Sequence, residues 1–236
     1  LQNEKTGEFF GTKTPSTTHD QSEGLLTGIL KICKEQNVDV NDIRSIIHGT
    51  TVATNAALEE KGAKAGLITT EGCEKILHVA RSWTPAPVSA WMGFFKPDPL
   101  ADLIHTSGAK ERMTAKGEVH LALDEDDIRK KVVAFYDQGV ESLTISLLNS
   151  YANPAHEERI REIAESINPT IPVSISFDIL PEFREYERTL TTVMNSYVRP
   201  SMQRYLKNVE SKLSDEQVDG RISIVRSDGG LMSIAA

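Results

Sequence analysis

The stretch RSIIHGTTVATNAALEEKGAKAGLITT, residues 44–70, gives the clearest indication of the fold class of this chain. The apolar pair Ile46 and Ile47 predicts a strand over residues 44–48, and residues 52–61 predict a helix with Gly62 as its C-cap. A second apolar run predicts a strand over residues 65–69, followed by a short helix over 73–79. This alternation indicates βαβ units, so we expect an α/β fold with a mixed, largely parallel sheet flanked by helices.

The flanking sequence continues the alternation of strands and helices. Capping and turn residues mark the ends of several of these elements. The expected elements are a hairpin over residues 1–14, a helix from Asp20 to about Asn37, a hairpin turning at Lys116 and Gly117, a helix from Asp124 to Gln138 that stops at Gly139, a strand over 142–148, a helix beginning at Pro154, a strand over 173–177, a helix over 184–213 with Pro200 as a kink or break, and a strand over 221–226.

Residues 81–107 differ in character, because four prolines interleave with tryptophan and phenylalanine residues. Proline interrupts regular helix and sheet, and so long an irregular segment is often functional. The aromatic side chains are compatible with an aromatic substrate and equally with a buried subunit interface.

Composition excludes several classes of protein. A formal net charge of −8 disfavours binding to a nucleic-acid backbone. The two cysteines, Cys33 and Cys73, form no disulfide framework and no zinc motif, which favours buried thiols in a reducing cytoplasm. No apolar run approaches the roughly 20 residues of a membrane helix, and no secretory signal opens the chain. The first residue is Leu1 rather than Met, so we expect the chain to begin inside a larger polypeptide or after processing.

The first candidate binding segment follows the strand over residues 44–48. It consists of His48, Gly49, Thr50 and Thr51, with Asn55 one turn further along. A strand end, a glycine and hydroxyls at a helix N-terminus suit an anion or a carbonyl group. The alternative is structural, with Thr50 or Thr51 capping the helix and His48 as a hydrogen-bonded core residue.

The second candidate segment opens the helix over residues 184–213. Its clustered threonines lower helix propensity, which indicates a site, and a solvated helix face with ion pairs is an equal alternative. We expect its members to line a secondary cleft or a subunit interface: Glu182, Arg184, Glu185, Arg188, Thr191 and Thr192.

The third candidate segment is Ser227, Asp228, Gly229 and Gly230, directly after the last predicted strand. Two glycines allow the backbone to approach a ligand closely, although Asp-Gly is also a common turn. The segment matches neither the dinucleotide fingerprint nor the P-loop. The chain has no His-Glu-x-x-His motif and no Gly-x-Ser-x-Gly motif, so we assign no metal site and no catalytic residue.

Several of these segments, taken in order, resemble the hydantoinase A and 5-oxoprolinase family, which is related to acetone and acetophenone carboxylase subunits. The resemblance is carried by HGTTVATNA (48–56), GLITT (66–70), SYANPAHE (150–157), LPEFREYERT (180–189) and SDGGL (227–231). It implies a lobe similar to part of the actin, Hsp70 and sugar-kinase superfamily. It divides the chain into an N-terminal hydantoinase/oxoprolinase region, residues 1–180, and the start of a following domain, residues 181–236.

The resemblance also implies a reaction. ATP with Mg²⁺ would activate a cyclic amide such as a hydantoin, 5-oxoproline or a lactam for hydrolysis, and a hydantoinase B-type subunit or domain would be the partner, with a homo-oligomer left open. The family's Gly-Gly-Thr phosphate loop and second nucleotide-binding half are absent here. We therefore expect a truncated lobe with no bound cofactor and no turnover of its own. The alternatives are a ketone carboxylase subunit and a non-catalytic scaffold.

Overall fold

The two strands predicted within residues 44–70 lie in different sheets. In the computed structural model, β1 (Ser45–His48) pairs with β8 (Arg221–Val225), whereas β2 (Ala65–Thr70) pairs with β3 (Thr106–Ala109) and β6 (Ser142–Ser146). The structure describes residues 1–17, 20–81, 98–218, 220–226 and 229–233. The expectation of one βαβ unit over residues 44–70 is therefore wrong, while the α/β class with parallel strands is confirmed.

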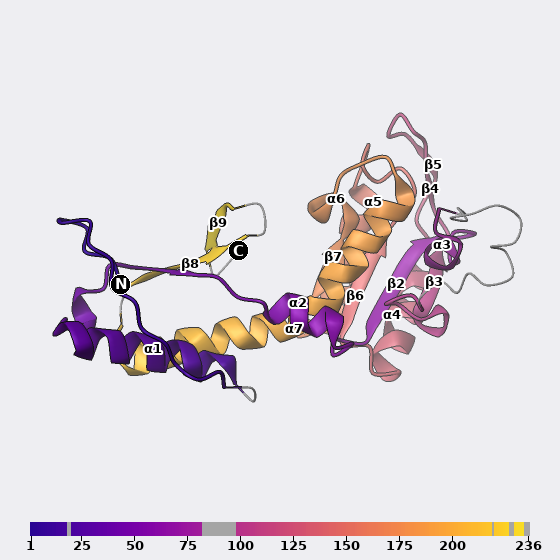
Figure 1. Cartoon of the computed structure of the whole chain (residues 1–236). Helices are drawn as coiled ribbons and strands as arrows, with labels where there is room; N and C mark the ends of the chain where they lie inside the picture. Colours follow the sequence, from indigo (N-terminus) through magenta and orange to yellow (C-terminus); the bar gives the residue numbers. More distant parts are fainter. Residues whose placement is uncertain (18–19, 82–97, 219, 227–228, 234–236) are drawn as a thin grey trace, which may run out of the picture. The chain divides into compact units, whose positions relative to one another are not determined.

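The chain forms two compact units, residues 1–58 with 201–236 and residues 59–200. The second unit holds a four-stranded sheet in the order β3-β2-β6-β7, with β7 at Val173–Ile175 and all neighbours parallel (Figure 1). A two-stranded antiparallel hairpin, β4 (Arg112–Met113) and β5 (Val119–Leu121), follows β3. Its turn contains Gly117 at φ 81°, as the sequence predicts.

Alternation along the strands of the second unit divides the sheet into two faces. Ile68 and Ile145 pack into a core with helices α4 (Glu125–Asp137) and α5 (Ala155–Ile167), and Figure 1 shows α5 lying along β6 and β7. Leu67 points to the opposite face, where it packs with Leu77 of α3 (Ile76–Val79) and Val193 of α7 (Glu185–Asp215). The sheet is thus covered by helices on both faces, which explains why its strands read as nearly continuous buried runs.

Hydroxyl side chains join the sheet to α7 on this second face. Thr144 donates to Ser196 at 2.7 Å, and Ser146 shares a hydrogen bond of 2.7 Å with Thr189. All four side chains are buried. Of the threonines clustered in this helix, Thr189 therefore serves to satisfy a polar group between the helix and the sheet.

The first unit contains a three-stranded sheet in the order β1-β8-β9, with β9 at Leu231–Ser233. Strands β1 and β8 are parallel, and β8 and β9 are antiparallel. Ile46 and Ile222 pack with apolar residues of α1 (Gln21–Gln36) and of the C-terminal part of α7. The predicted hairpin at the N-terminus is present as a single antiparallel bridge between Gln2 and Phe9.

Predicted element ends are confirmed where the signal is local. Asp20 caps α1, Asn37 ends it at φ 53°, Asp124 caps α4, and Gly139 follows α4 at φ 77°. Short 3-10 turns occupy Val40–Asp42 and Leu103–His105.

Other predicted ends are wrong. Helix α2 covers only Val52–Leu58, and Glu60, not Gly62, takes the left-handed conformation after it. Strand β7 stops at Ile175 because Ser176–Ile179 forms the short helix α6. Helix α7 continues through Pro200 rather than breaking there, and Pro200 is also the last residue of the second unit.

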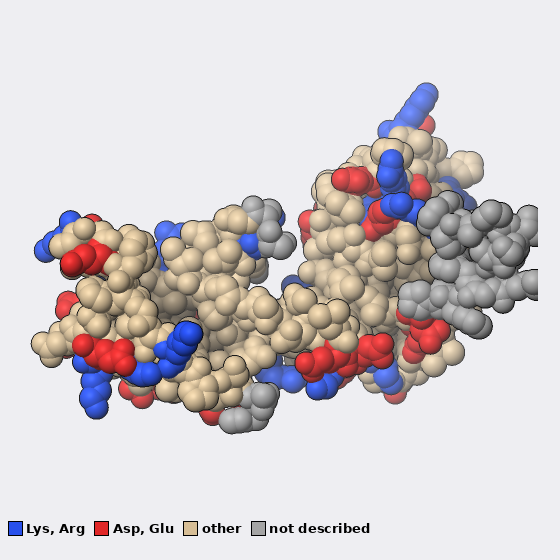
Figure 2. All heavy atoms as spheres, in the orientation of Figure 1, with Lys and Arg blue, Asp and Glu red and all other residues tan. Residues whose placement is uncertain are grey.

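Acidic and basic side chains are interspersed over the surface drawn in Figure 2. No helix in the described part of the chain combines the length and the apolar character needed to cross a membrane. The aromatic and proline-rich segment falls mostly within residues 82–97, which lie outside the described residues.

Candidate functional site

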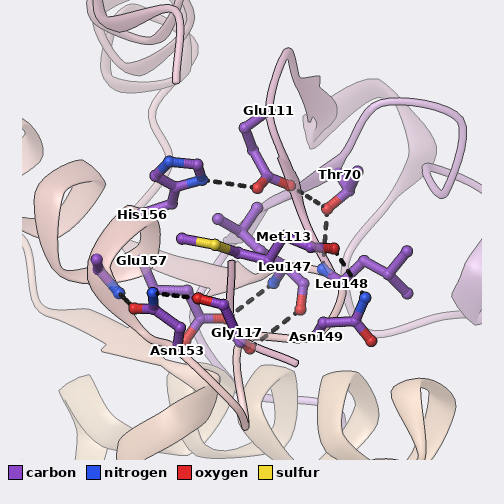
Figure 3. A network of polar contacts seen from close by, with 12 residues as sticks. Thr70, Glu111, Met113, Gly117, Leu147, Leu148, Asn149, Asn153, His156 and Glu157 are labelled. Atoms are coloured by element: carbon purple, nitrogen blue, oxygen red, sulfur yellow. Dashed lines mark hydrogen bonds and ion pairs between the residues drawn. The ribbon is translucent and has the colours of Figure 1, made fainter. Parts of the chain in front are cut away.

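Polar side chains gather where the central strands of the second unit end. Thr70 is the last residue of β2, Leu147 and Leu148 follow β6, and Glu111 follows β3. Because these strands are parallel, their carboxyl ends lie at one edge of the sheet, the place where α/β proteins bind ligands. Figure 3 shows this network from close by.

A chain of hydrogen bonds runs from the backbone of Leu148 to the imidazole of His156. The Leu148 amide donates to the Thr70 hydroxyl at 2.8 Å, so the Thr70 proton goes to Glu111, which it contacts. The other oxygen of Glu111 lies 2.8 Å from Nδ1 of His156 (Figure 3). With Glu111 as a carboxylate, Nδ1 must carry the proton, and Nε2 of the neutral ring is left as an acceptor. The Glu111 side chain is fully buried and the His156 side chain is 12% exposed.

The next residue, Glu157, is a buried carboxylate inside the fold. It accepts hydrogen bonds from the Leu147 amide at 2.8 Å, the Ser176 hydroxyl at 2.7 Å and the Phe177 amide at 3.0 Å. Burial raises its pKa above the ordinary value of 4.5, against the opposing effect of these donors. Glu157 thereby fixes the loop after β6 against the start of α6.

Two asparagines hold the β4–β5 hairpin against the same loop. Asn149 donates to the carbonyl of Met113 and Asn153 donates to the carbonyl of Gly117, both at 2.8 Å (Figure 3). Asn149 itself adopts a positive φ of 60°. These hydrogen bonds hold the hairpin and the loop together at the edge of the sheet, and the bond to Glu111 orients the His156 ring.

Arg188 of α7 is the largest fully buried side chain at this edge. Its terminal nitrogens donate to the carbonyls of Glu182 at 2.6 Å and Leu147 at 2.7 Å, and its guanidinium lies 5.6 Å from the centre of the Tyr151 ring. Burial lowers the pKa of Arg188, with nearby acidic groups opposing this. No ion pair of the described residues includes Arg188.

The structure separates the predicted residues around Arg188. Glu185 lines a small hollow together with Arg188, and Thr192 donates its hydroxyl to the Arg188 carbonyl at 2.7 Å. The side chains of Glu182 and Thr191 are exposed, and Arg184 lies over the Phe183 ring on the surface. Of the second candidate segment, therefore, Glu185 and Arg188 reach one place at the sheet edge, and the others do not.

The first candidate segment lies in the other unit, after β1. His48 Nε2 is 2.6 Å from the Tyr205 hydroxyl, and burial lowers the pKa of His48. The Thr50 hydroxyl accepts from the Val52 amide at 3.3 Å. Gly49 and Thr51 are exposed, and Asn55 is half-buried on α2.

The third candidate segment follows β8, the parallel neighbour of β1. His48 is aligned with Ile224, so the two segments leave the same edge of the three-stranded sheet. Gly229 has a φ of 84°, donates to the Arg226 carbonyl at 3.0 Å and is exposed, as is Gly230. Ser227 and Asp228 lie outside the described residues.

Thr70, Glu111 and His156 are not among the residues predicted from the sequence pattern, although Thr70 and His156 stand in segments that carry the family resemblance. The sequence points to two of these residues only through their positions in the predicted elements, because Thr70 ends a buried strand and His156 stands in the first turn of a helix. Among the residues that the structure describes, no cluster of three or more His, Cys, Asp or Glu side chains could hold a metal ion. The described residues would therefore hold a Mg²⁺ ion only if phosphate oxygens and water supplied most of its ligands.

Comparison with known proteins identifies the family. The family profile "Hydantoinase/oxoprolinase N-terminal region" matches residues 1–168, and the profile "Hydantoinase/oxoprolinase" matches residues 188–236. Together they follow the chain nearly from end to end.

Individual relatives agree with the profiles. The acetophenone carboxylase gamma subunit of Aromatoleum aromaticum is 33% identical over 97% of this chain and 33% of its own length. The caprolactamase subunit alpha of Pseudomonas jessenii is 30% identical over 93% of this chain and 32% of its own length. The solved structure of the ATP-dependent caprolactamase from Pseudomonas jessenii superimposes with a TM-score of 0.86 and 28% identity, over 98% of this chain and 34% of that one. The chain thus spans about a third of the length of these relatives, and it belongs to the hydantoinase/oxoprolinase family.

Proposed function

We propose that this chain is part of the substrate-activating subunit of an ATP-dependent amidohydrolase that opens a cyclic amide such as a hydantoin, 5-oxoproline or a lactam. The observation that carries the proposal is the likeness of fold, over almost the whole chain, to a caprolactamase that is named as ATP-dependent. Phosphorylation of an amide oxygen would supply a good leaving group, and the protein would position the reactants and neutralise charge.

The proposed phosphate or substrate cleft lies in the first unit. The segment from His48 to Asn55 and the segment from Ser227 to Gly230 would line it, because they follow neighbouring parallel strands. The hydrogen bond between His48 and Tyr205 fixes the imidazole, and Gly49 and Gly229 are exposed and carry no side chain that would keep a ligand from the backbone. ATP would arrive with Mg²⁺ bound to its phosphates, and we place the protein in the cytoplasm.

One observation favours a second function, a ketone carboxylase subunit. A named carboxylase subunit, that of Aromatoleum aromaticum, is at least as similar in sequence as the caprolactamase subunit. Both relatives are named as subunits, which supports a partner subunit for this protein, of the hydantoinase B type or a second copy of the chain. A non-catalytic scaffold is the remaining possibility.

The test measures ADP release by the natural gene product that carries this chain, with the subunits that co-purify with it. Release that depends on a hydantoin, 5-oxoproline or caprolactam supports the amidohydrolase. Release that depends on acetone or acetophenone together with bicarbonate supports the carboxylase instead. If neither substrate class stimulates ADP release and calorimetry detects no ATP binding, both enzyme proposals fail and the scaffold remains.

A further inference from the structure

A small hollow lies at the carboxyl ends of β2 and β6, beside the N-terminal turn of α7. The polar residues that line it are Thr69, Cys73, Ser146, Glu185, Arg188 and Thr189. Its volume is about 10 Å³, which is roughly the space that the centre of one water molecule needs. The hollow can therefore receive one oxygen atom of a ligand, but not a whole ring or a nucleotide.

Arg188 lines this hollow and carries a donor that has no acceptor among the described residues. Both of its terminal nitrogens donate to main-chain carbonyls, whereas Nε is buried without an acceptor among the described residues. The side chain as a whole is 1% exposed. A buried charged donor without a partner costs several kcal/mol, so such a group calls for an acceptor that the chain itself does not supply.

A second donor is available from Thr69. Its side chain is 2% exposed and lines the hollow, and its hydroxyl makes no hydrogen bond with the residues that the structure describes. The hydroxyls of Ser146 and Thr189, by contrast, are already bonded to each other at 2.7 Å. The hollow therefore offers one charged N–H and one hydroxyl, an arrangement suited to an oxygen that carries negative charge.

Glu185 limits the charge of a ligand that would fit. It lines the same hollow and forms no ion pair with Arg188 within the described part of the chain. Its carboxylate would repel a phosphate dianion more strongly than a monoanion. We propose that the hollow binds one oxygen of a small planar carboxylate, with Arg188 Nε–H and the Thr69 hydroxyl as donors. The proposed site uses none of the residues proposed for the phosphate or substrate cleft, and it does not depend on which reaction the family member catalyses.

Cys73 provides a direct measurement of occupancy, because it lines the hollow and is half-buried, whereas Cys33 is 2% exposed. The experiment follows alkylation of Cys73 in this chain by iodoacetamide, resolved from Cys33 by peptide mass spectrometry. Sodium formate is added at constant ionic strength, with sodium chloride as the matched salt and sodium phosphate as the dianion. We expect formate to slow the alkylation of Cys73 about tenfold at saturation, and chloride and phosphate to have little effect.

Variants identify the donors. Arg188→Lys and Thr69→Val should each raise the formate concentration for half-protection about tenfold, since each removes a hydrogen bond to a charged oxygen. Glu185→Gln should lower that concentration, and Glu182→Gln, an exposed acid that does not line the hollow, should leave it unchanged. Should Arg188→Lys fail to fold, as judged by circular dichroism, Thr69→Val decides alone.

Three results would overturn the proposal. The first is alkylation of Cys73 that formate does not slow, as expected for a hollow that holds only water. The second is equal protection of the wild type and the Thr69→Val variant. The third is protection by phosphate that matches protection by formate, which would assign the effect to general anion binding.

Discussion

The Tyr197 ring occupies the space that a side chain on Gly62 would need. A Cβ added to Gly62 would lie 2.1 Å from Cε1 of Tyr197, and the amide of Ala63 donates to the Tyr197 carbonyl at 2.8 Å. These contacts bring the segment before β2 directly against α7 within the second unit. Gly62 is therefore required for close packing, and not for the helix cap that its position in the sequence predicts.

Replacing Gly62 with alanine should destabilise the chain by about 1–3 kcal/mol, because the Tyr197 ring would have to shift from the place where it packs. Urea denaturation followed by circular dichroism measures the change. Gly11→Ala is the control, since a Cβ there meets nothing within 4 Å, and it should change the free energy of unfolding by less than about 0.5 kcal/mol. Equal stability of the Gly62→Ala variant and the wild type would contradict the packing role.

The sequence predicts those features that depend on neighbouring residues. Asp124 caps α4 because its side chain reaches the amide of Asp127, and Gly139 can adopt its positive φ without a side chain that clashes. Such signals are read within one turn of chain, so they are correct wherever tertiary packing does not override them. The end of α2 is an exception, because the packing of Gly62 against Tyr197, and not a helix cap, requires a glycine at position 62.

Features that join distant residues could not be read from local pattern. Strand β1 looks like the partner of β2, yet its hydrogen bonds go to β8 near the other end of the chain. Within the candidate site, Glu111 is 41 residues from Thr70 and 45 from His156. Periodicity carries no information on such pairings, so the network at the sheet edge emerges only from the folded chain.

The buried carboxylate of Glu157 should give the protein a recognisable dependence on pH. Glu157→Gln should cost about 2–4 kcal/mol, since a donor NH₂ would face either the Phe177 amide or the Leu147 amide. Because burial raises the pKa of Glu157, its contribution to stability is full below the ordinary value of 4.5 and is lost as pH rises through the raised pKa. Denaturation midpoints of both proteins between pH 4 and 8 should converge with rising pH. A constant difference would contradict the raised pKa.

Asp20 should have the opposite dependence on pH. It caps α1 and lies 2.7 Å from Lys212, and this pair with the Ser22 donors lowers the pKa of Asp20 from 3.8 to about 2. Its stabilisation is present above pH 3.8 and is lost as pH falls towards 2. Asp20→Asn keeps a capping side chain but removes the charge, so it should cost about 1–2 kcal/mol near pH 7 and little near pH 2. Thermal unfolding at both pH values measures this, and Lys212→Met should reproduce the effect.

The direction of the hydrogen bonds at the sheet edge predicts the tautomer of His156. Since Thr70 accepts from Leu148 and donates to Glu111, the Glu111 carboxylate should draw the imidazole proton to Nδ1. Nitrogen-15 NMR of labelled histidine distinguishes the two tautomers of the neutral ring. Glu111→Gln should shift the population towards the Nε2–H form, whereas His120 on the exposed strand β5 serves as an unaffected reference. Detection of Nε2–H in the wild type would show that Glu111 does not direct this ring.

Substitutions of His48 and Tyr205 test whether the first candidate segment is held in place before any ligand binds. The Tyr205 hydroxyl is 2.6 Å from His48 Nε2, so Tyr205→Phe should cost about 1 kcal/mol at pH 8, where the neutral imidazole accepts that proton. Burial lowers the pKa of His48, so its contribution to stability is full above the ordinary value of 6.5 and is lost as pH falls through the lowered pKa. His48→Gln should remove this slope in urea titrations between pH 5 and 8, while Tyr205→Phe should lower stability chiefly at the upper end. If neither substitution alters stability, the ring is not fixed by Tyr205, and the segment must be ordered by its ligand instead.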